Sequence, residues 1–262
     1  MRKDAINLEE TRLEGVDTIE DYQIFKERHR VFPAVFENRQ HKRVLDIAAG
    51  VGCSSQRIFN MYSKNLVSSD ISPTALKILY NMGIPTLAFD IDDNNAAFPF
   101  PDGYFDAIVS LVTLEHLLYF DNFLQEIHRI LSDHGFLYIS TPNYAAPEYM
   151  ANPILRGKTF HDPFGPVSKY EFFAHVRYFT YETLLDVVRH FGFTPDTVYL
   201  ALPGGSTRYQ NLYSNSKVKA LAYRYAMMMK HVLLPARFAS EPILCCQKDG
   251  ESMQKRVRKV VL

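Results

Sequence analysis

The chain has 262 residues, of which 47% are hydrophobic and 22% charged, and its 29 basic residues balance 29 acidic ones. These figures are typical of one α/β domain with a sizeable core, and the balance of charge argues against an extended nucleic-acid footprint. Three cysteines are too few for a disulfide framework, and Cys and His do not group at metal-ligand spacings. The sequence shows no apolar leader and no run of about 20 apolar residues. We therefore expect a cytoplasmic protein with no metal, no nucleic-acid partner and no stable membrane insertion.

The segment before the first strand, residues 18–38, has the apolar spacing of a helix with one buried face. Its apolar side chains are those of Tyr22, Phe25, Val31, Phe32 and Phe36. We expect this helix to pack against the domain that follows it.

The most informative segment is residues 44–55, where a buried strand (44–47) leads into a turn of small residues and a helix that begins near Cys53. Gly50 and Gly52 allow a ligand to approach the backbone and permit a positive φ, and the helix amino terminus offers free N–H groups. The spacing Gly-x-Gly-x-x-Ser lacks the third glycine of a dinucleotide-binding fingerprint. Asp46 would repel a pyrophosphate but attract an ammonium group, so adenosine carrying an amino acid fits better than NAD.

Further strand ends follow at the spacing of βαβ units. A strand over residues 66–70 ends in Asp70, about 20 residues after the glycine turn, where a carboxylate can bind both ribose hydroxyls. Residues 88–92 form a third strand end, which carries Asp90. The remaining elements of this half are a strand at 107–111, a helix at 123–131 and a strand within 135–143.

This succession resembles the class I S-adenosylmethionine (SAM)-dependent methyltransferase family over residues 40–200. Five ordered segments carry the resemblance: Leu-Asp-x-x-x-Gly-x-Gly at 45–52, Ser-Asp-Ile-Ser-Pro at 69–73, Phe-Pro-Phe-Pro-Asp-Gly-x-Phe-Asp at 98–106, Leu-Glu-His-Leu at 114–117 and Ser-Thr-Pro-Asn at 140–143. The resemblance implies a three-layer Rossmann-like α/β sandwich, with a seven-stranded mixed sheet whose last strand is antiparallel.

The resemblance also implies SAM as the cofactor. The residues expected to bind it are Asp46, Ala48, Gly50, Gly52, Cys53, Asp70, Ile71, Asp90, Ile91 and Leu111. Asp46 and the glycine turn should face the methionine half, Asp70 the ribose, and Asp90 the adenine amino group. Asp70 has a turn-forming role ahead of Pro73 as its alternative, and Asp92 and Asp93 are rivals of Asp90.

A leading helix caps the cofactor in this family. Tyr22, Arg28 and Arg30 are therefore candidates to reach the methionine carboxylate, with solvated arginines as the alternative.

Two histidines are candidates for catalysis. Methyl transfer from a sulfonium mainly needs alignment and a dry pocket, but transfer to a hydroxyl also needs a proton acceptor. His116 follows the fourth strand at its carboxyl end and has a suitable intrinsic pKa; a helix-start histidine bonded to backbone is the alternative. His175, in the segment 175–180, either lines the acceptor pocket or only fastens the preceding insertion to the core.

The connection over residues 144–175 is rich in Pro, Gly and aromatic residues, and we expect it to be a long irregular wall of the substrate pocket. The expected layout is one methyltransferase domain over residues 1–250 and a frayed basic tail over 251–262. Within the domain, the parts are cofactor-capping helices (1–42), the SAM-binding core (43–143), the substrate-side insertion (144–178) and the carboxyl-terminal half (179–250).

The carboxyl-terminal half begins with Thr180 as the N-cap of a helix that Gly192 ends. A strand over 197–202 and a last strand over 242–247 follow, with a helix over 217–234 between them. That helix combines apolar and basic residues. We favour a core-packing or dimerising helix with snorkelling lysines over a membrane-binding one, and a homodimer remains open.

These observations predict a SAM-dependent methyltransferase that acts on a small molecule, at a hydroxyl of a sugar, glycan precursor or secondary metabolite. The alternatives are an N- or C-methyltransferase on another small metabolite, and a catalytically silent SAM-binding scaffold. A nicotinamide-dependent oxidoreductase leaves Asp46 and residues 98–117 without a role. An RNA or protein methyltransferase is disfavoured by the neutral charge balance.

Overall fold

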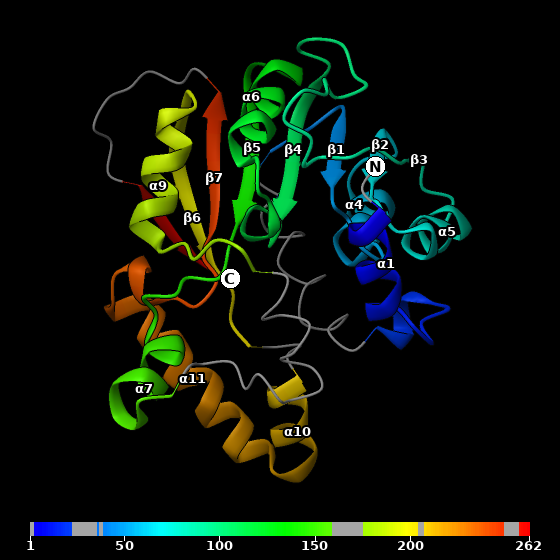
Figure 1. Cartoon of the computed structure of the whole chain (residues 1–262). Coiled ribbons are helices and arrows are strands. Elements are labelled where there is room, and N and C mark those ends of the chain that lie inside the picture. The colour runs from blue at the N-terminus through cyan, green and yellow to red at the C-terminus, as the bar shows by residue number, and fades with distance from the viewer. Residues whose placement is uncertain (1–2, 23–35, 37–38, 159–174, 204–206, 249–256) are drawn as a thin grey trace.

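The computed structural model describes residues 3–22, 36, 39–158, 175–203, 207–248 and 257–262. At its centre lies a sheet with the strand order β3-β2-β1-β4-β5-β7-β6-β8 (Figure 1). The strands are β1 (Val44–Ile47), β2 (Leu66–Ser69), β3 (Thr86–Leu87), β4 (Phe105–Leu111), β5 (Leu131–Ser140), β6 (Phe193–Leu200), β7 (Ile243–Lys248) and β8 (Arg258–Val261). Of these strands, β7 alone runs antiparallel to its neighbours, β5 and β6. The expected mixed α/β sheet is thus confirmed.

Helices cover both faces of the sheet because side chains alternate along each strand. On one face, Leu45 and Ile47 share a buried cluster with α6 (Phe120–Ile130) and α9 (Tyr181–His190). On the other face, Val44 belongs to a cluster with residues of α4 (Cys53–Met61) and α5 (Pro73–Asn81). The strand β1 lies inside the sheet between β2 and β4. Its carboxyl end therefore lies in the middle of the sheet edge and not at a corner.

Over the residues that the structure describes, the sheet has eight strands rather than the expected seven, because residues of the basic tail pair with it. Residues 258–261 form β8, which pairs parallel to β6. The Lys259 ammonium donates to the carbonyl oxygens of Val232 and Leu234 at 2.9 and 3.0 Å. It thereby satisfies carbonyl groups at the end of a helix, which lack intrahelical partners. The expectation of a frayed tail is therefore wrong for these residues.

The third strand is shorter than expected and lies earlier in the chain. It comprises residues 86–87, and only these two residues pair with β2. Asp90 accepts a hydrogen bond from the Asp92 N–H at 3.1 Å, and Asp93 accepts one from the Asn95 N–H at 2.9 Å. These side chains close local turns, which compete with continued strand pairing.

Two helices were not expected from the sequence: α7 (Pro147–Arg156) and α10 (Thr207–Asn215). The helix α1 (Lys3–Arg12) and the short 3-10 turn η1 (Ile19–Asp21) lie within residues 1–42, where helices were expected. The helix α7 occupies part of the connection that we expected to be irregular. Pro147 at its first turn and Gly157 (φ 61°) at its end are favourable helix boundaries. The predicted helix 18–38 lies mostly outside the described residues.

The helix α9 confirms its predicted caps: Thr180 accepts a hydrogen bond from the Thr183 N–H, and Gly192 follows the helix with φ 82°. The predicted helix 217–234 is also present, as α11 (Lys217–Leu233). The core-packing role that we favoured for α11 is wrong, because only Ala220 and His231 of this helix are buried. Among the described residues, no helix is long and apolar enough to cross a bilayer.

Candidate functional site

The turn between β1 and α4 has the backbone conformation that its glycines predict. Gly50 and Gly52 have φ values of 56° and 86°, and Ala48 shares this left-handed region with φ 54°. A Cβ at Gly52 would lie 2.5 Å from a side-chain carbon of Leu79, so a side chain there requires Leu79 to move. A Cβ at Gly50 would meet no atom within 4 Å. The backbone at Gly50 therefore borders space that a ligand could fill.

Asp70 lies directly beside this turn, although it comes from the end of β2. Its carboxylate accepts hydrogen bonds from the N–H groups of Gly50 at 2.8 Å and of Ser72 at 2.9 Å. Burial raises the pKa of Asp70 to about 6, against the lowering effect of these bonds. Each carboxylate oxygen can accept a second hydrogen bond, so Asp70 can serve both the turn and a ligand. Its neighbour Ile71 is half-buried.

Asp46, in contrast, is fully enclosed within β1. It accepts a hydrogen bond from the Ser55 hydroxyl at 2.5 Å, and Ser55 in turn accepts one from Ser68 at 2.9 Å. Burial raises the pKa of Asp46 to about 7, and the nearby charge of Asp70 acts in the same direction. Two carboxyl groups with raised pKa values thus lie at adjacent strand ends, a feature common in functional sites. The sequence analysis noted Ser55 only as the residue in place of the third glycine and gave it no role.

The amino-terminal segment covers the outer side of the turn. Cys53 and Val51 belong to a buried cluster that includes Leu13, after α1, and Ile19 of η1. The partly buried side chain of Tyr22 packs against this cluster. Two other candidates for the methionine carboxylate, Arg28 and Arg30, lie outside the described residues. The expectation that the amino-terminal segment packs against the domain is therefore confirmed for Leu13, Ile19 and Tyr22, whereas its role as a cap over the cofactor stays a prediction.

The loop after β3 contains Asp90 and Ile91, both half-buried. Asp92, the rival of Asp90, is 4% exposed and accepts a hydrogen bond from the Tyr119 N–H at 2.8 Å. This bond ties the loop to the start of α6. Asp93 is exposed and bonded within its own turn. The assignment of Asp90 to the adenine amino group therefore stays a prediction.

The end of β4 has an unusual backbone. Leu111 is half-buried at the last position of the strand, and Val112 follows with φ 51°. A β-branched residue in this region is strained, and such strain is often found at functional sites. The sequence analysis missed this feature because no local pattern signals a valine with positive φ.

The structure brings His116 and His175 together. His116 ends the 3-10 turn η2 (Leu114–His116) after β4, and its ring centroid lies 4.7 Å from that of His175 in an edge-to-face arrangement. The Tyr144 hydroxyl and His175 Nδ1 are hydrogen-bonded at 2.5 Å. The Glu115 carboxylate is fully buried and lies 3.8 Å from His116 Nε2. Tyr144 is a further member of this group that the sequence analysis did not single out.

The end of the 144–178 insertion is fixed to the same turn. The Glu115 carbonyl oxygen accepts hydrogen bonds from the N–H groups of Val176 at 2.9 Å and Arg177 at 3.1 Å. The Arg177 guanidinium also donates to the Leu118 carbonyl at 2.8 Å. These bonds fix the backbone next to His175, so its place beside His116 is set by two segments that are distant in the sequence.

One atom each of Glu115, His116 and His175 lies within 4.8 Å of the others. Two imidazoles and a carboxylate are donors that divalent transition metals accept. The spacing of these residues in the sequence gave no sign of the cluster, since folding alone brings His175 to the other two. The same groups are suited to hold and move a proton.

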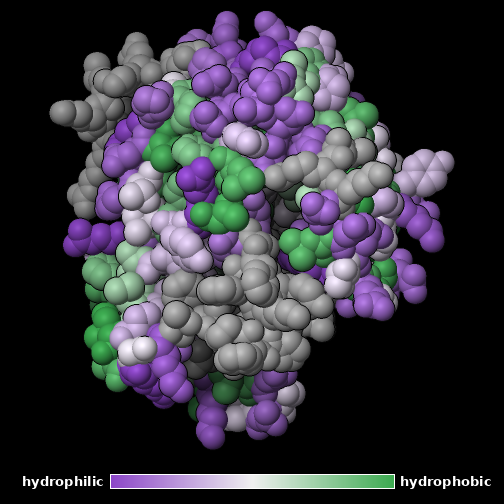
Figure 2. Space-filling view, viewed as in Figure 1, coloured by the Kyte–Doolittle hydropathy of each residue, from purple (hydrophilic) through white to green (hydrophobic). Residues whose placement is uncertain are grey.

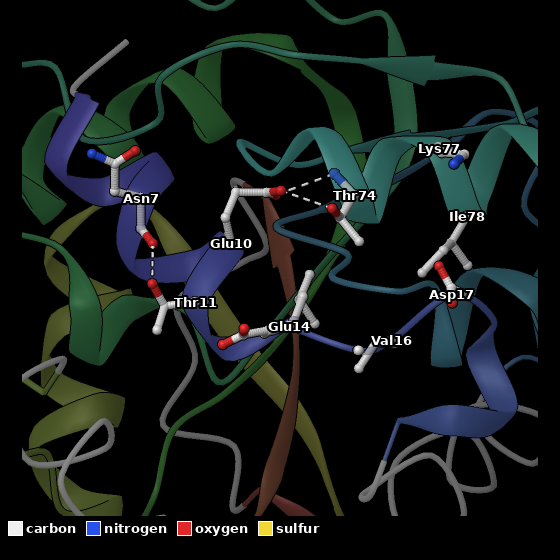
Figure 3. A pocket seen from close by; sticks show the side chains of 11 residues that line it. Asn7, Glu10, Thr11, Glu14, Val16, Asp17, Thr74, Lys77 and Ile78 are labelled. Carbon is white, nitrogen blue, oxygen red and sulfur yellow. Dashed lines mark hydrogen bonds between the residues drawn. The ribbon is translucent and has the colours of Figure 1, made fainter.

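A cavity of about 580 Å³ lies elsewhere, between α1 and α5 (Figure 3). It is lined by Glu10, whose carboxylate accepts hydrogen bonds from the Thr74 hydroxyl at 2.7 Å and its N–H at 3.2 Å. None of the predicted site residues lines this cavity. Glu10 instead joins α1 to the first turn of α5, and the candidate site remains at the carboxyl ends of β1, β2 and β4.

Comparison with known proteins agrees with this geometry. A family model described as a methyltransferase domain matches residues 16–198. The ubiquinone/menaquinone biosynthesis C-methyltransferase UbiE of Edwardsiella ictaluri is 33% identical over 119 residues, which cover 43% of this chain and 47% of that protein. Ajmaline N-methyltransferase of Rauvolfia serpentina is 28% identical over 35% of this chain and 33% of its own length. The matching region thus spans less than half of each of these relatives.

A solved structure has the same fold over nearly the whole chain. It is a SAM-dependent methyltransferase from Thermotoga maritima, described as a possible histamine N-methyltransferase. It superposes with a TM-score of 0.60 at 16% identity and covers 94% of this chain and 99% of its own.

Proposed function

We propose that this chain, which belongs to the class I SAM-dependent methyltransferases, methylates a hydroxyl group of a small molecule such as a sugar, a glycan precursor or a secondary metabolite. The observation that carries the proposal is the cluster of His116, His175 and Glu115 at the carboxyl end of β4. The strand β4 pairs with β1, so this cluster and the glycine turn lie at the same edge of the sheet, where open α/β sheets bind ligands.

SAM fits the residues at this edge. The ribose hydroxyls would donate hydrogen bonds to the Asp70 carboxylate, which also accepts one from the Gly50 N–H. The open space beside Gly50 leaves room for the methionine half. Asp46 would supply negative charge beneath the turn, and the backbone of Ala48 and Cys53 would contact the methionine half. Ile71, Ile91 and Leu111 would contact the adenosine, with Asp90 at the adenine amino group. When bound, SAM supplies an electrophilic methyl group on a sulfonium that is already a good leaving group.

The chain's own contribution to the chemistry is alignment and proton transfer. His116, as the neutral imidazole, takes the proton of the acceptor hydroxyl as the oxygen–carbon bond forms. The buried Glu115 carboxylate, 3.8 Å from Nε2, stabilises the resulting imidazolium because charges interact strongly away from water. His175, oriented by Tyr144, lines the acceptor side and fixes the His116 ring by edge-to-face contact.

A second candidate reaction is C-methylation of a hydroxylated ring. The relatives named ubiquinone/menaquinone C-methyltransferases favour it. It would use the same histidine, since removal of a hydroxyl proton makes the neighbouring ring carbon nucleophilic. Transfer to nitrogen, as the name of the ajmaline relative suggests, needs no such base.

The experiment is incubation of the full chain with SAM that carries an isotopically labelled methyl group and a panel of sugars, phenols, hydroquinones and amines. A product whose new methyl carbon has the chemical shift of a methyl ether supports the O-methyl proposal. A ring-methyl or N-methyl product would replace it with one of the alternatives. SAM binding without turnover on any acceptor would favour the silent scaffold.

The metal alternative is tested in the same assay. If His116 acts as a base, treatment with EDTA leaves turnover unchanged. Loss of turnover that a divalent cation restores would reassign Glu115, His116 and His175 as metal ligands.

A further inference from the structure

One face of α11 carries apolar side chains that point away from the protein. Val218, Leu221, Tyr225, Val232 and Leu233 are 77, 58, 60, 53 and 69% exposed. At 100° per residue these positions fall within about one third of the helix circumference, which places them on one stripe of the helix. The buried residues Ala220 and His231 lie on the opposite side, against the protein. We call this stripe of five residues the α11 ridge.

Basic residues border the α11 ridge on both sides. At 100° per residue, Lys217 and Arg224 project to one side of the ridge and Lys219 to the other; Lys230, on the same side as Lys219, is paired with Glu148. The helix contains no acidic residue over Lys217–Leu233. The order of basic, apolar and basic strips across one helix face is typical of helices that lie in a membrane interface.

The neighbouring helix α7 extends this surface. Glu148 of α7 forms an ion pair with Lys230, which holds α7 against α11. On α7, Met150, Ile154 and Leu155 are 39, 70 and 79% exposed. Figure 2 shows hydrophobic side chains at the lower left edge of the molecule, where Figure 1 places α7. In Figure 1, α7, α10 and α11 lie together beyond the carboxyl ends of β1, β4 and β5, at the same end of the sheet as the candidate site.

We propose that the α11 ridge docks on the surface of an anionic lipid bilayer. The apolar side chains would enter the boundary of headgroups and acyl chains, while the flanking lysines and arginine meet lipid phosphates. A second copy of the chain fits this face less well. Ridge against ridge would bring Lys217, Lys219 and Arg224 of two helices together, and α11 itself has no acidic residue to pair with them, so like charges would repel. This proposal does not depend on which group is methylated.

The test is co-sedimentation of the full chain with vesicles. We expect binding to phosphatidylcholine vesicles that contain about 30% phosphatidylglycerol, weak binding to phosphatidylcholine alone, and loss of binding at high salt. The double variant Leu221→Glu/Tyr225→Glu should abolish binding. The matched control is Met61→Glu/Tyr80→Glu, which should bind like the original protein. Met61 and Tyr80 lie at the carboxyl-terminal ends of α4 and α5, and their side chains are 59% and 74% exposed.

The charge contribution is tested with Lys219→Gln/Arg224→Gln. Each basic residue near an anionic surface contributes about a five-fold gain in affinity, so this variant should bind about 25-fold more weakly. All variants change exposed positions, and thermal unfolding verifies that each remains folded.

Fluorescence gives a second readout, because the chain contains no tryptophan. Tyr225→Trp should shift its emission to shorter wavelength when anionic vesicles are added, and Tyr80→Trp should not. The proposal is overturned if the original protein binds neither vesicle, if both vesicles bind it equally, or if the two tryptophans respond alike. It is also overturned if Leu221→Glu/Tyr225→Glu leaves vesicle binding unchanged, or if its effect is to convert a dimer into a monomer without vesicles present.

Discussion

The imidazole rings of His116 and His175 meet edge to face, with centroids 4.7 Å apart and planes inclined by 69°. His116 follows β4, whereas His175 comes after the long insertion. The contact is held by backbone bonds from Val176 and Arg177 to the Glu115 carbonyl. The carboxyl-terminal end of the insertion therefore lies beside the end of β4, where a methyl acceptor would bind.

Removal of the His116 imidazole should separate chemistry from binding. His116→Ala should lower turnover by about 10²–10⁴-fold, because the acceptor proton loses its base. SAM affinity should stay nearly unchanged. The measurement is steady-state kinetics paired with calorimetric titration of SAM, and His190→Ala, an exposed histidine on α9, is the matched control.

Equal loss of SAM affinity and turnover in His116→Ala would assign this residue to the cofactor site. Unchanged turnover would leave His175, or alignment without any base, as the better account. The companion variant His175→Ala distinguishes these two outcomes.

Loss of the Asp70 carboxylate should act on binding. Asp70→Ala removes two charge-assisted hydrogen bonds to the ribose, worth roughly 1.5–3 kcal/mol each, and should weaken SAM binding by about 100-fold or more. The exposed Asp186→Ala on α9 serves as the control. If Asp70→Ala binds SAM as tightly as the original protein, Asp70 serves only the turn that it forms with Gly50 and Ser72.

Asp46 gives a pH-dependent prediction for the SAM-free protein. Its pKa is raised from 3.8 to about 7, so the folded state holds its proton where the unfolded chain has released it. Ionisation of Asp46 therefore costs stability progressively as the pH rises from about 4 to about 7. Asp46→Asn keeps an acceptor for Ser55 and removes this cost. Its melting temperature relative to the original protein should rise more at pH 8 than at pH 5; an equal fall at both pH values contradicts the prediction.

The two turn glycines should respond differently to alanine. At Gly52 the new Cβ would lie 2.5 Å from Leu79 and 2.9 Å from Met82, so Gly52→Ala should be strongly destabilising, by about 2 kcal/mol or more. At Gly50 the cost is the backbone strain of positive φ, about 1 kcal/mol. Gly50→Ala should instead weaken SAM binding, because its Cβ projects into open space. Denaturant unfolding and titration of both variants test this, and equal stability losses would refute it.

The sequence predicts the parts of the fold that local patterns govern. The runs 44–47 and 66–69, the helix α6 and the Thr180 cap follow from apolar spacing and capping chemistry. The strand β8 was not predictable in this way, since a basic tail becomes a strand only by pairing with β6 and anchoring Lys259 on the end of α11.

The residues of the candidate site likewise fall into those that local motifs predict and those that depend on the path of the chain. Gly50, Gly52 and Asp70 lie on strand ends whose order the motifs specify. The approach of His175 and Tyr144 to His116 depends on the path of the insertion, and the strain at Val112 has no local signal. The outward face of α11 was misjudged because periodicity identifies an apolar stripe without stating what it faces.

The central claim is that the edge formed by the glycine turn and Asp70 binds SAM. Isothermal titration of the full chain with SAM, and separately with S-adenosylhomocysteine, tests it most directly. The account predicts saturable binding of both, with dissociation constants well below about 1 mM, and no comparable binding of NADH. Absence of binding by either sulfur ligand up to about 1 mM would contradict it.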